Sequence, residues 1–312
     1  MRLCCNCGKP FDHASWQCPS CLYEPKRLGG HLAFAPELAE KSEGFDASYF
    51  GRLAELEPGS FWFRSRNRLL CWALEHYFPD ATNFLEIGCG TGFVLAGIRK
   101  ELPRLSLGGG EVFSAGLSFA ADRLPGVELF QMDARQIPFE SEFDVIGAFD
   151  VLEHIGDDEL VLSQMYQAVR KGGGILLTVP QHSFLWSEVD EYSRHVRRYS
   201  MSELKAKVKR AGFKTLRATS FVSLLLPLML IARLKQRPAN REFDPTAEFK
   251  LGALANYLLE RVMDVERAMI SLGVSIPAGG SLLLVAKKPA TTLIGIPFKR
   301  LFAAGDAIDK CN

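Results

Sequence analysis

The chain has 312 residues, of which 47% are hydrophobic and 23% are charged. This length and composition allow one globular α/β domain of ordinary size together with smaller extensions. The 37 Lys and Arg residues nearly balance the 36 Asp and Glu residues, so the formal net charge is only +1. Such a balance does not favour a nucleic acid as partner, because proteins that bind nucleic acids usually carry a strongly basic surface.

The sequence shows no sign of a secreted or membrane-spanning chain. Its first ten residues, MRLCCNCGKP, contain no apolar run of the kind found in secretory signals. The longest apolar stretch, residues 221–232, has twelve residues, whereas a helix that spans a bilayer needs about 20. We therefore expect a cytoplasmic protein, in which cysteines act as thiols or metal ligands rather than in disulfides.

Five of the eight cysteines lie within the first 21 residues. Two C-x-x-C pairs there have the spacing of a closed tetrahedral Zn²⁺ site, with ligands Cys4, Cys7, Cys18 and Cys21. So short a segment cannot bury enough surface to fold alone, and bound metal would stabilise it. We predict a zinc-ribbon-like module over residues 1–28. A redox pair and a disordered tail are the alternatives, and Cys5 leaves open which sulfur atoms bind the metal.

The rest of the chain divides by its hydrophobic pattern. Residues 29–80 predict a mostly helical N-terminal extension. From residue 81, short apolar runs alternate with amphipathic stretches, which predicts βαβ units, and the runs are continuous, as in parallel strands covered on both faces. The predicted strands are residues 84–87, 105–107, 127–132, 143–149, 175–179 and 281–286. We expect a doubly wound, Rossmann-like α/β domain over residues 81–290 and a tail over 291–312.

Several helices are predicted between these strands. Hydrophobic residues recur at every fourth position over 94–102 and over 161–169. Residues 170–172, Arg-Lys-Gly, are typical of the end of the second helix. Residues 200–203 have the spacing of a capping box that opens another helix. Residues 251–272 predict a further amphipathic helix.

A glycine-rich turn joins the first predicted strand to the helix after it. Its glycines are Gly88, Gly90 and Gly92. Glycines at such a turn let the backbone approach a ligand closely. A dinucleotide fingerprint would need Gly or Ala at position 93, where the chain has Phe93. Glu86, at the strand end, would repel a diphosphate but suits a ligand with an ammonium and a sulfonium group. The turn therefore favours S-adenosylmethionine over NAD.

Acidic residues also follow the next three strands. Glu111 could accept hydrogen bonds from ribose hydroxyls, and Asp133, beside Ala134, could accept one from an adenine amino group. Asp150 follows the fourth strand, where the methionyl group would lie. An acid at a strand end more often caps a helix or faces solvent. Four of them in order after a glycine-rich turn instead predict one cofactor site, since parallel strands end at the same crevice.

These segments resemble the class I S-adenosylmethionine-dependent methyltransferases. The matching pieces are residues 85–92, Glu111, residues 133–139 and residues 143–155, within a region of about 60–215. The resemblance implies a seven-stranded, mostly parallel sheet with one antiparallel strand near an edge. It also implies that Glu86 and the loop glycines surround the methionyl group, while Glu111 and Asp133 hold ribose and adenine. Aspartate is commoner in the family at the position of Glu111.

The sequence offers one candidate for a general base. Methyl transfer from a sulfonium is an in-line displacement in which the protein chiefly positions the acceptor. A hydroxyl or ammonium acceptor must also lose a proton. His154, four residues after Asp150, is the predicted base; a loop histidine without a catalytic role is the alternative.

Residues 181–199 form a polar loop rich in aromatic residues, and we expect it to contact the acceptor. The loop resembles that of a bacterial methyltransferase group with unassigned acceptors. In an acceptor pocket, the arginines of this loop would hold an anionic group. The alternative is a structural loop with a solvated charged face. The predicted acceptor-pocket residues are His182, Trp186, Asp190, His195, Arg198 and Tyr199.

Two further segments suggest contacts outside the sheet. The extension over 29–80 could cover the cofactor as a lid, with Arg64 or Arg66 paired with the methionyl carboxylate; simple packing of a helix is the alternative. Residues 220–272 form an apolar and helical insertion. Its apolar stretch and the basic residues after it, over 221–241, predict a peripheral contact at the inner membrane surface. A core helix or a subunit contact is the alternative.

The sequence thus predicts S-adenosylmethionine-dependent methyl transfer to an unidentified acceptor. A small molecule or a lipid-linked molecule is favoured. RNA stays among the candidates because some methyltransferases of ribosomal RNA carry a similar N-terminal zinc module. The alternatives are a non-catalytic partner protein that binds S-adenosylmethionine and a nucleotide-dependent oxidoreductase.

Overall fold

The computed structural model describes residues 1–13, 15–40, 49–235 and 251–290, and the side chains of 232–235 are not included in that description. The predicted tail, 291–312, lies outside the described residues. So does the basic part of the predicted membrane contact from residue 236 onward.

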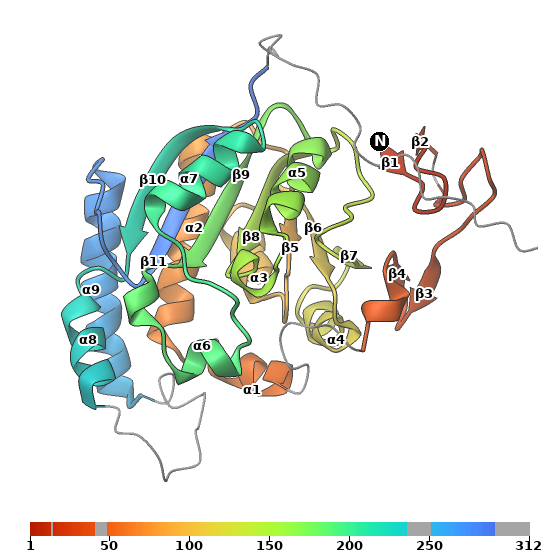
Figure 1. Cartoon of the computed structure of the whole chain (residues 1–312). Helices are drawn as coiled ribbons and strands as arrows, with labels where there is room; N and C mark the ends of the chain where they lie inside the picture. Colours follow the sequence, from red (N-terminus) through yellow and green to blue (C-terminus); the bar gives the residue numbers. More distant parts are fainter. Residues whose placement is uncertain (14, 41–48, 236–250, 291–312) are drawn as a thin grey trace, which may run out of the picture.

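The centre of the molecule is a nine-stranded sheet with the order β10-β11-β9-β8-β5-β6-β7-β4-β3 (Figure 1). Seven of its strands form the predicted Rossmann-like domain, and only β11 among these seven runs antiparallel to its neighbours. Their bounds are β5 (Asn83–Ile87), β6 (Ser106–Glu111), β7 (Glu128–Gln131), β8 (Phe143–Phe149), β9 (Val169–Pro180), β10 (Lys214–Phe221) and β11 (Ser281–Lys287). The doubly wound fold expected from the sequence is therefore confirmed.

Helices cover both faces of this sheet (Figure 1). On one face lie α2 (Phe61–Tyr77), α3 (Phe93–Glu101), α4 (Ser114–Arg123) and α9 (Ala253–Ser271), and on the other α5 (Asp158–Ala168) and α7 (Met201–Arg210). The side chains of β5 alternate between the two cores, with Phe84 in the first and Leu85 in the second. Shorter elements border the cavity described below: α1 (Tyr49–Leu56), a 3₁₀ helix (Leu152–His154), α6 (Glu188–Tyr192) and α8 (Leu226–Lys235). A second 3₁₀ helix (Ser183–Leu185) precedes α6.

Of two local predictions, one differs from the structure and the other agrees with it. Residues 170–172 do not end a helix, because β9 begins at Val169 directly after α5. The basic residues there form the solvent-exposed start of a long strand. By contrast, the predicted cap at Ser200 is present: its hydroxyl oxygen accepts a hydrogen bond from the backbone N–H of Glu203 at 3.2 Å.

The N-terminal segment belongs to the main sheet. A small pair, β1 (Arg2–Leu3) and β2 (Pro10–Phe11), leads to a hairpin of β3 (Lys26–Leu28) and β4 (His31–Ala33). Strand β4 pairs in parallel with β7, which extends the sheet to nine strands where seven were expected. The predicted boundary at residue 28 falls inside this hairpin. The strand at 31–33 precedes the helices α1 (Tyr49–Leu56) and α2 (Phe61–Tyr77) of the extension predicted as mostly helical.

Aromatic rings fix the N-terminal segment on the sheet. The ring of Trp16 packs 4.6 Å from that of Phe34 and 5.5 Å from that of Phe139, measured between centroids. The backbone N–H of Leu3 also donates to Pro138 O at 2.9 Å. These contacts hold the cysteine segment against the face that carries α5 and α7.

Helices α2 and α9 are joined by a cluster of ion pairs. Arg64 donates two hydrogen bonds to the carboxylate of Glu260, at 2.6 and 3.2 Å, and Arg68 donates one at 2.6 Å. The donated bond from Arg64 is the main reason why the pKa of Glu260 falls to about 2. Arg64 therefore holds two helices together, and of the two arginines predicted as partners of the methionyl carboxylate only Arg66 lines the cavity described below.

Candidate functional site

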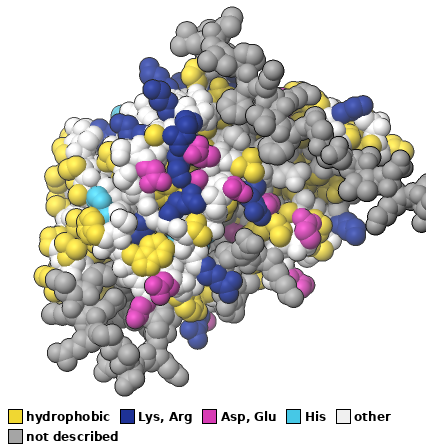
Figure 2. All heavy atoms as spheres, viewed as in Figure 1, with side chains coloured by type: hydrophobic (Ala, Val, Ile, Leu, Met, Phe, Trp, Pro, Cys, Tyr) yellow, Lys and Arg dark blue, Asp and Glu magenta, His cyan; other side chains and the backbone are white. Residues whose placement is uncertain are grey.

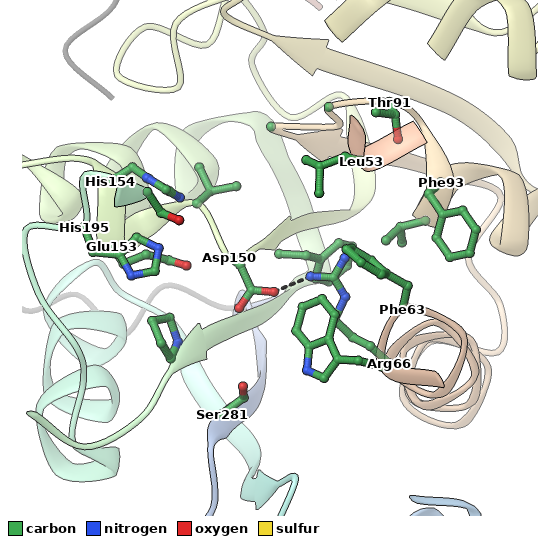
Figure 3. Close-up of a pocket in the computed structure, with 18 of the residues that line it drawn as sticks. Leu53, Phe63, Arg66, Thr91, Phe93, Asp150, Glu153, His154, His195 and Ser281 are labelled. Carbon is green, nitrogen blue, oxygen red and sulfur yellow. Dashed lines mark hydrogen bonds and ion pairs between the residues drawn. The ribbon is translucent and has the colours of Figure 1, made fainter. Parts of the chain in front are cut away.

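A cavity of about 660 Å³ opens at the carboxyl ends of the parallel strands. It lies beside β5, where the strand order reverses: the chain runs from β5 through β6 to β7 on one side and then crosses to β8 on the other side of β5. Ligands of doubly wound folds bind at this point, and the volume is within the usual range for small-molecule sites. The wall comes from α1, α2, the loops after β5 to β8, the loop after α6, and the start of α8 (Figure 3).

The glycine loop (residues 88–92) forms one side of the cavity. Gly88, Gly90 and Gly92 have φ values of +69°, +51° and +75°, a region that L side chains rarely adopt. A Cβ on Gly88 would lie 2.5 Å from Cγ2 of Val151. Gly92 is the residue that caps the start of α3, so unpaired N–H groups of that helix lie next to the cavity.

Two buried glutamates lie beneath the glycine loop and line the cavity. Glu111 accepts hydrogen bonds from the backbone N–H groups of Gly90 at 3.0 Å and Phe113 at 3.1 Å, and thus supports the loop. Glu86 is 2% exposed, and its Oε2 has no hydrogen-bond partner within the described part of the chain. Burial raises the pKa of both carboxyl groups, that of Glu86 well above its usual range. A cationic ligand would favour the ionised form of Glu86.

Asp133, Ala134 and Asp150 also line the cavity, as predicted for one common site. The carboxylate of Asp133 pairs with the guanidinium of Arg135 at 2.9 Å. Asp150 has a φ of +57°, and its carboxylate pairs with Arg66 and accepts a hydrogen bond from the hydroxyl of Thr178 at 3.3 Å (Figure 3). Aspartate tolerates this backbone region better than most residues.

Helix α2 supplies a wall of the cavity. Its Trp62 and Phe63 line the space, and the guanidinium carbon of Arg66 lies 4.4 Å from the centroid of the Trp62 ring. Arg66 is thus directed into the cavity by an aromatic residue and by Asp150. The pairing of Arg66 with the methionyl carboxylate stays a prediction.

On the other side of Asp150, three polar side chains lie together: Glu153, His154 and His195 (Figure 3). The rings of the two histidines meet edge to face at 4.7 Å between centroids. Burial, and secondarily the neighbouring His195, lowers the pKa of His154 to about 3. So low a value makes His154 a weak base near neutral pH, where a catalytic base works best with a pKa close to the pH.

The loop over 181–199 is organised by the buried carboxylate of Asp190. It pairs with Nδ1 of His195 at 2.8 Å and with two nitrogens of Arg198 at 2.7 and 2.9 Å. It also accepts a hydrogen bond from the Ser187 hydroxyl at 3.0 Å. His195 and Arg198 line the cavity. The loop arginines were predicted to hold an anionic group of the acceptor, but Arg198 binds the carboxylate of Asp190 in the same loop.

Three of the predicted acceptor-pocket residues lie elsewhere. Tyr199 is fully buried, and its hydroxyl donates to Asp158 at 2.6 Å, so it fixes the loop to α5. The ring of His182 stacks against Phe184, and Trp186 is 39% exposed on the surface. None of these three side chains contributes to the wall of this cavity, and their contact with the acceptor stays a prediction.

Two acidic residues of the cavity, Glu57 and Glu153, were not predicted as site residues. Glu57, after α1, accepts hydrogen bonds from the hydroxyl of Thr91 at 2.6 Å and from Arg123 at 2.8 Å, and so anchors the glycine loop. No local pattern marks this residue. Glu153 directly precedes His154 and lies three positions after Asp150. This close spacing of side chains that can bind a ligand could have marked Glu153 as a site residue.

The four predicted zinc ligands converge in the N-terminal segment. The sulfur atoms of Cys4 and Cys21 are 3.5 Å apart, and those of Cys7 and Cys18 are 3.7 Å apart. All four lie within 4.8 Å of one another, and Cys5 is not part of the group. A tetrahedral zinc site with Zn–S bonds of about 2.3 Å has sulfur–sulfur edges of about 3.8 Å. The arrangement of sulfurs thus fits the ion.

Comparisons with known proteins agree with this geometry. A family model described as a methyltransferase domain matches residues 54–218. A Mycolicibacterium smegmatis protein named as an S-adenosylmethionine-dependent methyltransferase is 26% identical over 165 residues, which are 51% of this chain and 62% of that protein. The phthiotriol/phenolphthiotriol dimycocerosates methyltransferase 1 of Mycobacterium ulcerans is 28% identical over 174 residues, 54% of this chain and 64% of that protein. The chain therefore spans less than two thirds of these relatives.

Among solved structures, a chain of the complex between the Haloferax volcanii Trm112 methyltransferase activator and a methyltransferase has a similar fold. Its TM-score is 0.51 at 16% sequence identity, and the match covers 78% of this chain and 97% of that chain. At this level of identity the similarity concerns the fold alone.

Proposed function

Because this chain belongs to the class I S-adenosylmethionine-dependent methyltransferases, we propose that it transfers a methyl group from that donor to an apolar, lipid-like acceptor. The observation that carries the proposal is the division of the cavity wall into two parts. The glycine loop and buried acids form one end, and hydrophobic residues of α8 and α9 form the other. The first end suits a cationic donor, and the second suits an acceptor with an extended apolar part.

At the glycine-loop end, Glu86 and the backbone of the loop would hold the methionyl group. Glu111 would accept from the ribose and Asp133 from the adenine amino group. The donor supplies a methyl group on a positively charged sulfur. The protein's own part is to position the acceptor and to exclude water. Ionisation of the Glu86 carboxyl beside the donor's ammonium group would offset the cost of burying both charges.

The acceptor end is lined by hydrophobic side chains that come from around α8 and α9. They are Val222, Leu225, Leu228, Met229, Leu251 and Leu259. A relative of this chain is named as a methyltransferase of phthiotriol dimycocerosates, which are lipids. Both observations support a lipid-like acceptor over RNA, since RNA recognition needs cationic or stacking groups and these six side chains are neither cationic nor aromatic.

The acceptor class can be tested with a methyl-labelled donor and a fractionated cell lysate. We expect the purified protein to transfer label into the lipid fraction. Leu259→Ala should reduce this transfer about tenfold without changing donor binding, because it removes apolar contact to the acceptor only. The exposed Leu160 on α5 offers the control Leu160→Ala. Label found only in RNA, protein or water-soluble molecules would contradict the proposal.

We further propose that this region contacts a membrane surface. Helices α8 and α9 and the turn before α8 expose several large hydrophobic residues, and the left edge of the molecule over these helices is rich in hydrophobic atoms (Figure 2). These residues include Leu224, Leu228, Leu230, Ile231, Leu254, Tyr257 and Leu258. None of the helices in the described part of the chain is long and apolar enough to cross a membrane. The contact would therefore be peripheral, with the acceptor end of the cavity facing the lipid.

Flotation with anionic liposomes tests this contact. The wild type is expected to float with the vesicles, whereas the triple variant Leu230→Ser, Leu254→Ser, Leu258→Ser should stay in the dense fraction. These side chains are 38%, 72% and 55% exposed, so the fold should tolerate the change. The double variant Leu160→Ser, Leu216→Ser, at exposed positions outside α8 and α9, is the control. Equal flotation of all three proteins would refute the assigned surface.

Finally, we propose that Cys4, Cys7, Cys18 and Cys21 hold a structural Zn²⁺ ion. The sulfur distances fit the ion, and the segment has only short strands of its own. Bound metal would keep the turn around Trp16 in place, and Trp16 packs against the main sheet. The ion would thus stabilise the attachment of the N-terminal segment rather than take part in the reaction.

A further inference from the structure

One group of cavity residues has no role in the proposed function. Glu153 and His154 come from the 3₁₀ helix after β8, and His195 comes from the loop after α6. Each offers one ligand atom, and these atoms all lie within 4.8 Å of one another. Figure 3 shows the three side chains together on the side of Asp150 that faces away from Arg66. The fold thus gathers a carboxylate and two imidazoles at a single point of the cavity wall.

The carboxylate of Glu153 lacks a partner. Its side chain is 0% exposed, and neither of its oxygens has a hydrogen-bond partner within the described residues. A buried ionised carboxylate costs several kcal/mol unless a cation or several donors compensate for it. The three arginines of the cavity wall pair with other carboxylates: Arg66 with Asp150, Arg135 with Asp133 and Arg198 with Asp190. A cation from outside the chain would provide the missing charge.

The surroundings of His195 are those of a metal ligand. Its Nδ1 pairs with the buried carboxylate of Asp190 at 2.8 Å, and Arg198 holds that carboxylate from the other side. A carboxylate that binds one ring nitrogen of histidine fixes the tautomer and leaves the other nitrogen with its lone pair. In metal sites this outer contact both orients the ring and raises its basicity as a ligand. Nε2 of His195 is therefore available to bind a cation.

We propose that Glu153, His154 and His195 bind a divalent transition-metal cation in the cavity wall beside Asp150. One carboxylate and two imidazoles are ligands that suit Mn²⁺, Fe²⁺, Co²⁺ or Zn²⁺. Three protein ligands leave coordination positions open, as in metal sites that also bind a substrate. The site differs from the cysteine cluster in its ligands, and it lies in the cavity rather than in the N-terminal segment.

The role of this cation rests on the proposed function. An acceptor alcohol or phenol that binds the cation through its oxygen loses its proton more readily, and the proton leaves to water. The oxygen then forms a bond to the methyl carbon of the donor, while the carbon–sulfur bond breaks and its electron pair stays on sulfur. The products are the methyl ether and S-adenosylhomocysteine. A cation at this site would therefore restrict the range of acceptors to lipid-like molecules with a hydroxyl group.

Titration with Mn²⁺ tests the site without any reaction. Mn²⁺ prefers oxygen and nitrogen ligands to thiolates, so the cysteine cluster of zinc-loaded protein does not compete for it. Loss of the free-ion signal in electron paramagnetic resonance should show about one bound Mn²⁺ per chain. Glu153→Gln keeps the shape of the side chain but removes its charge, and should weaken binding at least about tenfold. Glu128→Gln, at an exposed glutamate on β7, is the matched control and should bind like the wild type.

A second measurement shows whether the variant has kept its fold. Glu153→Gln removes a buried carboxylate without a partner, so its melting temperature in the absence of metal should be no lower than that of the wild type. Mn²⁺ should then raise the melting temperature of the wild type and leave that of Glu153→Gln unchanged. The absence of Mn²⁺ binding by the wild type, or equal binding by Glu153→Gln, would overturn the site.

Calorimetry with S-adenosylmethionine separates this inference from the proposed function. Protein that binds the donor but not Mn²⁺ would refute the cation and leave the methyltransferase function in place. Protein that binds Mn²⁺ but not the donor would refute the methyltransferase function and leave the metal site.

Discussion

Replacement of Gly88 by alanine is expected to lower the affinity for S-adenosylmethionine by about 100-fold or more, on the order of 3 kcal/mol. The added Cβ would lie 2.5 Å from Cγ2 of Val151, and the backbone at position 88 has a φ of +69°. Val151 directly follows Asp150, so relief of this clash must move one of the two loops on either side of the donor site. The expected loss thus comes from displaced binding groups as well as from backbone strain.

Gly126→Ala is the matched control for this experiment. Gly126 has a φ of +83°, and an added Cβ there would meet nothing within 4 Å. Both variants carry the same kind of strain, about 1–2 kcal/mol, but only Gly88 borders the cavity. Calorimetry should therefore show normal donor binding for Gly126→Ala. Normal binding by Gly88→Ala as well would mean that the glycine loop does not hold the donor.

The second large effect is expected from Cys18→Ser. The variant should lose nearly all of the zinc that wild-type protein carries, about one ion per chain, because a serine hydroxyl is a poor ligand in place of a buried thiolate. Cys18 is 1% exposed, so the hydroxyl would also be buried. Without the ion, the turn around Trp16 loses its support, and the melting temperature should fall. Zinc analysis and thermal unfolding measure the two effects.

Cys5→Ser provides the comparison for Cys18→Ser. Cys5 lies in the same segment but outside the group of four sulfurs, so its variant should keep the metal and melt close to the wild type. Equal zinc content in wild type and Cys18→Ser would exclude the four-cysteine site. Loss of zinc in Cys5→Ser alone would assign the metal to a different set of sulfurs.

The central strands could be predicted because parallel strands covered on both faces are continuous apolar runs. Strand β8 has the predicted bounds, 143–149. Strand β6 was predicted only over 105–107, since its second half is Gly108 to Gly110 and carries no apolar signal. Close packing explains these glycines: a Cβ on Gly109 would lie 2.9 Å from side-chain atoms of Cys89, Leu95 and Leu129. Only the folded sheet shows this requirement.

The donor end of the cavity was easier to predict than the acceptor end. Its residues follow strands directly, so the topology of the sheet alone brings Glu86, Glu111, Asp133 and Asp150 together. The loop over 181–199 has no such constraint. Arg198 lines the cavity while its neighbour Tyr199 is buried against Asp158, and the sequence does not indicate which of two adjacent polar residues faces the ligand. The internal partner of Arg198, Asp190, becomes evident only in the folded loop.

The parallel pairing of β4 with β7 has a consequence for how copies of this protein behave together. An uncovered β7 would present unpaired backbone groups, which invite a strand from another molecule. Here the outermost strand is instead β3, three residues long and starting with Lys26 and Arg27. Short, positively charged border strands are a known safeguard against intermolecular sheet growth. We therefore expect the N-terminal hairpin to disfavour pairing of this edge of the sheet with a strand of another copy.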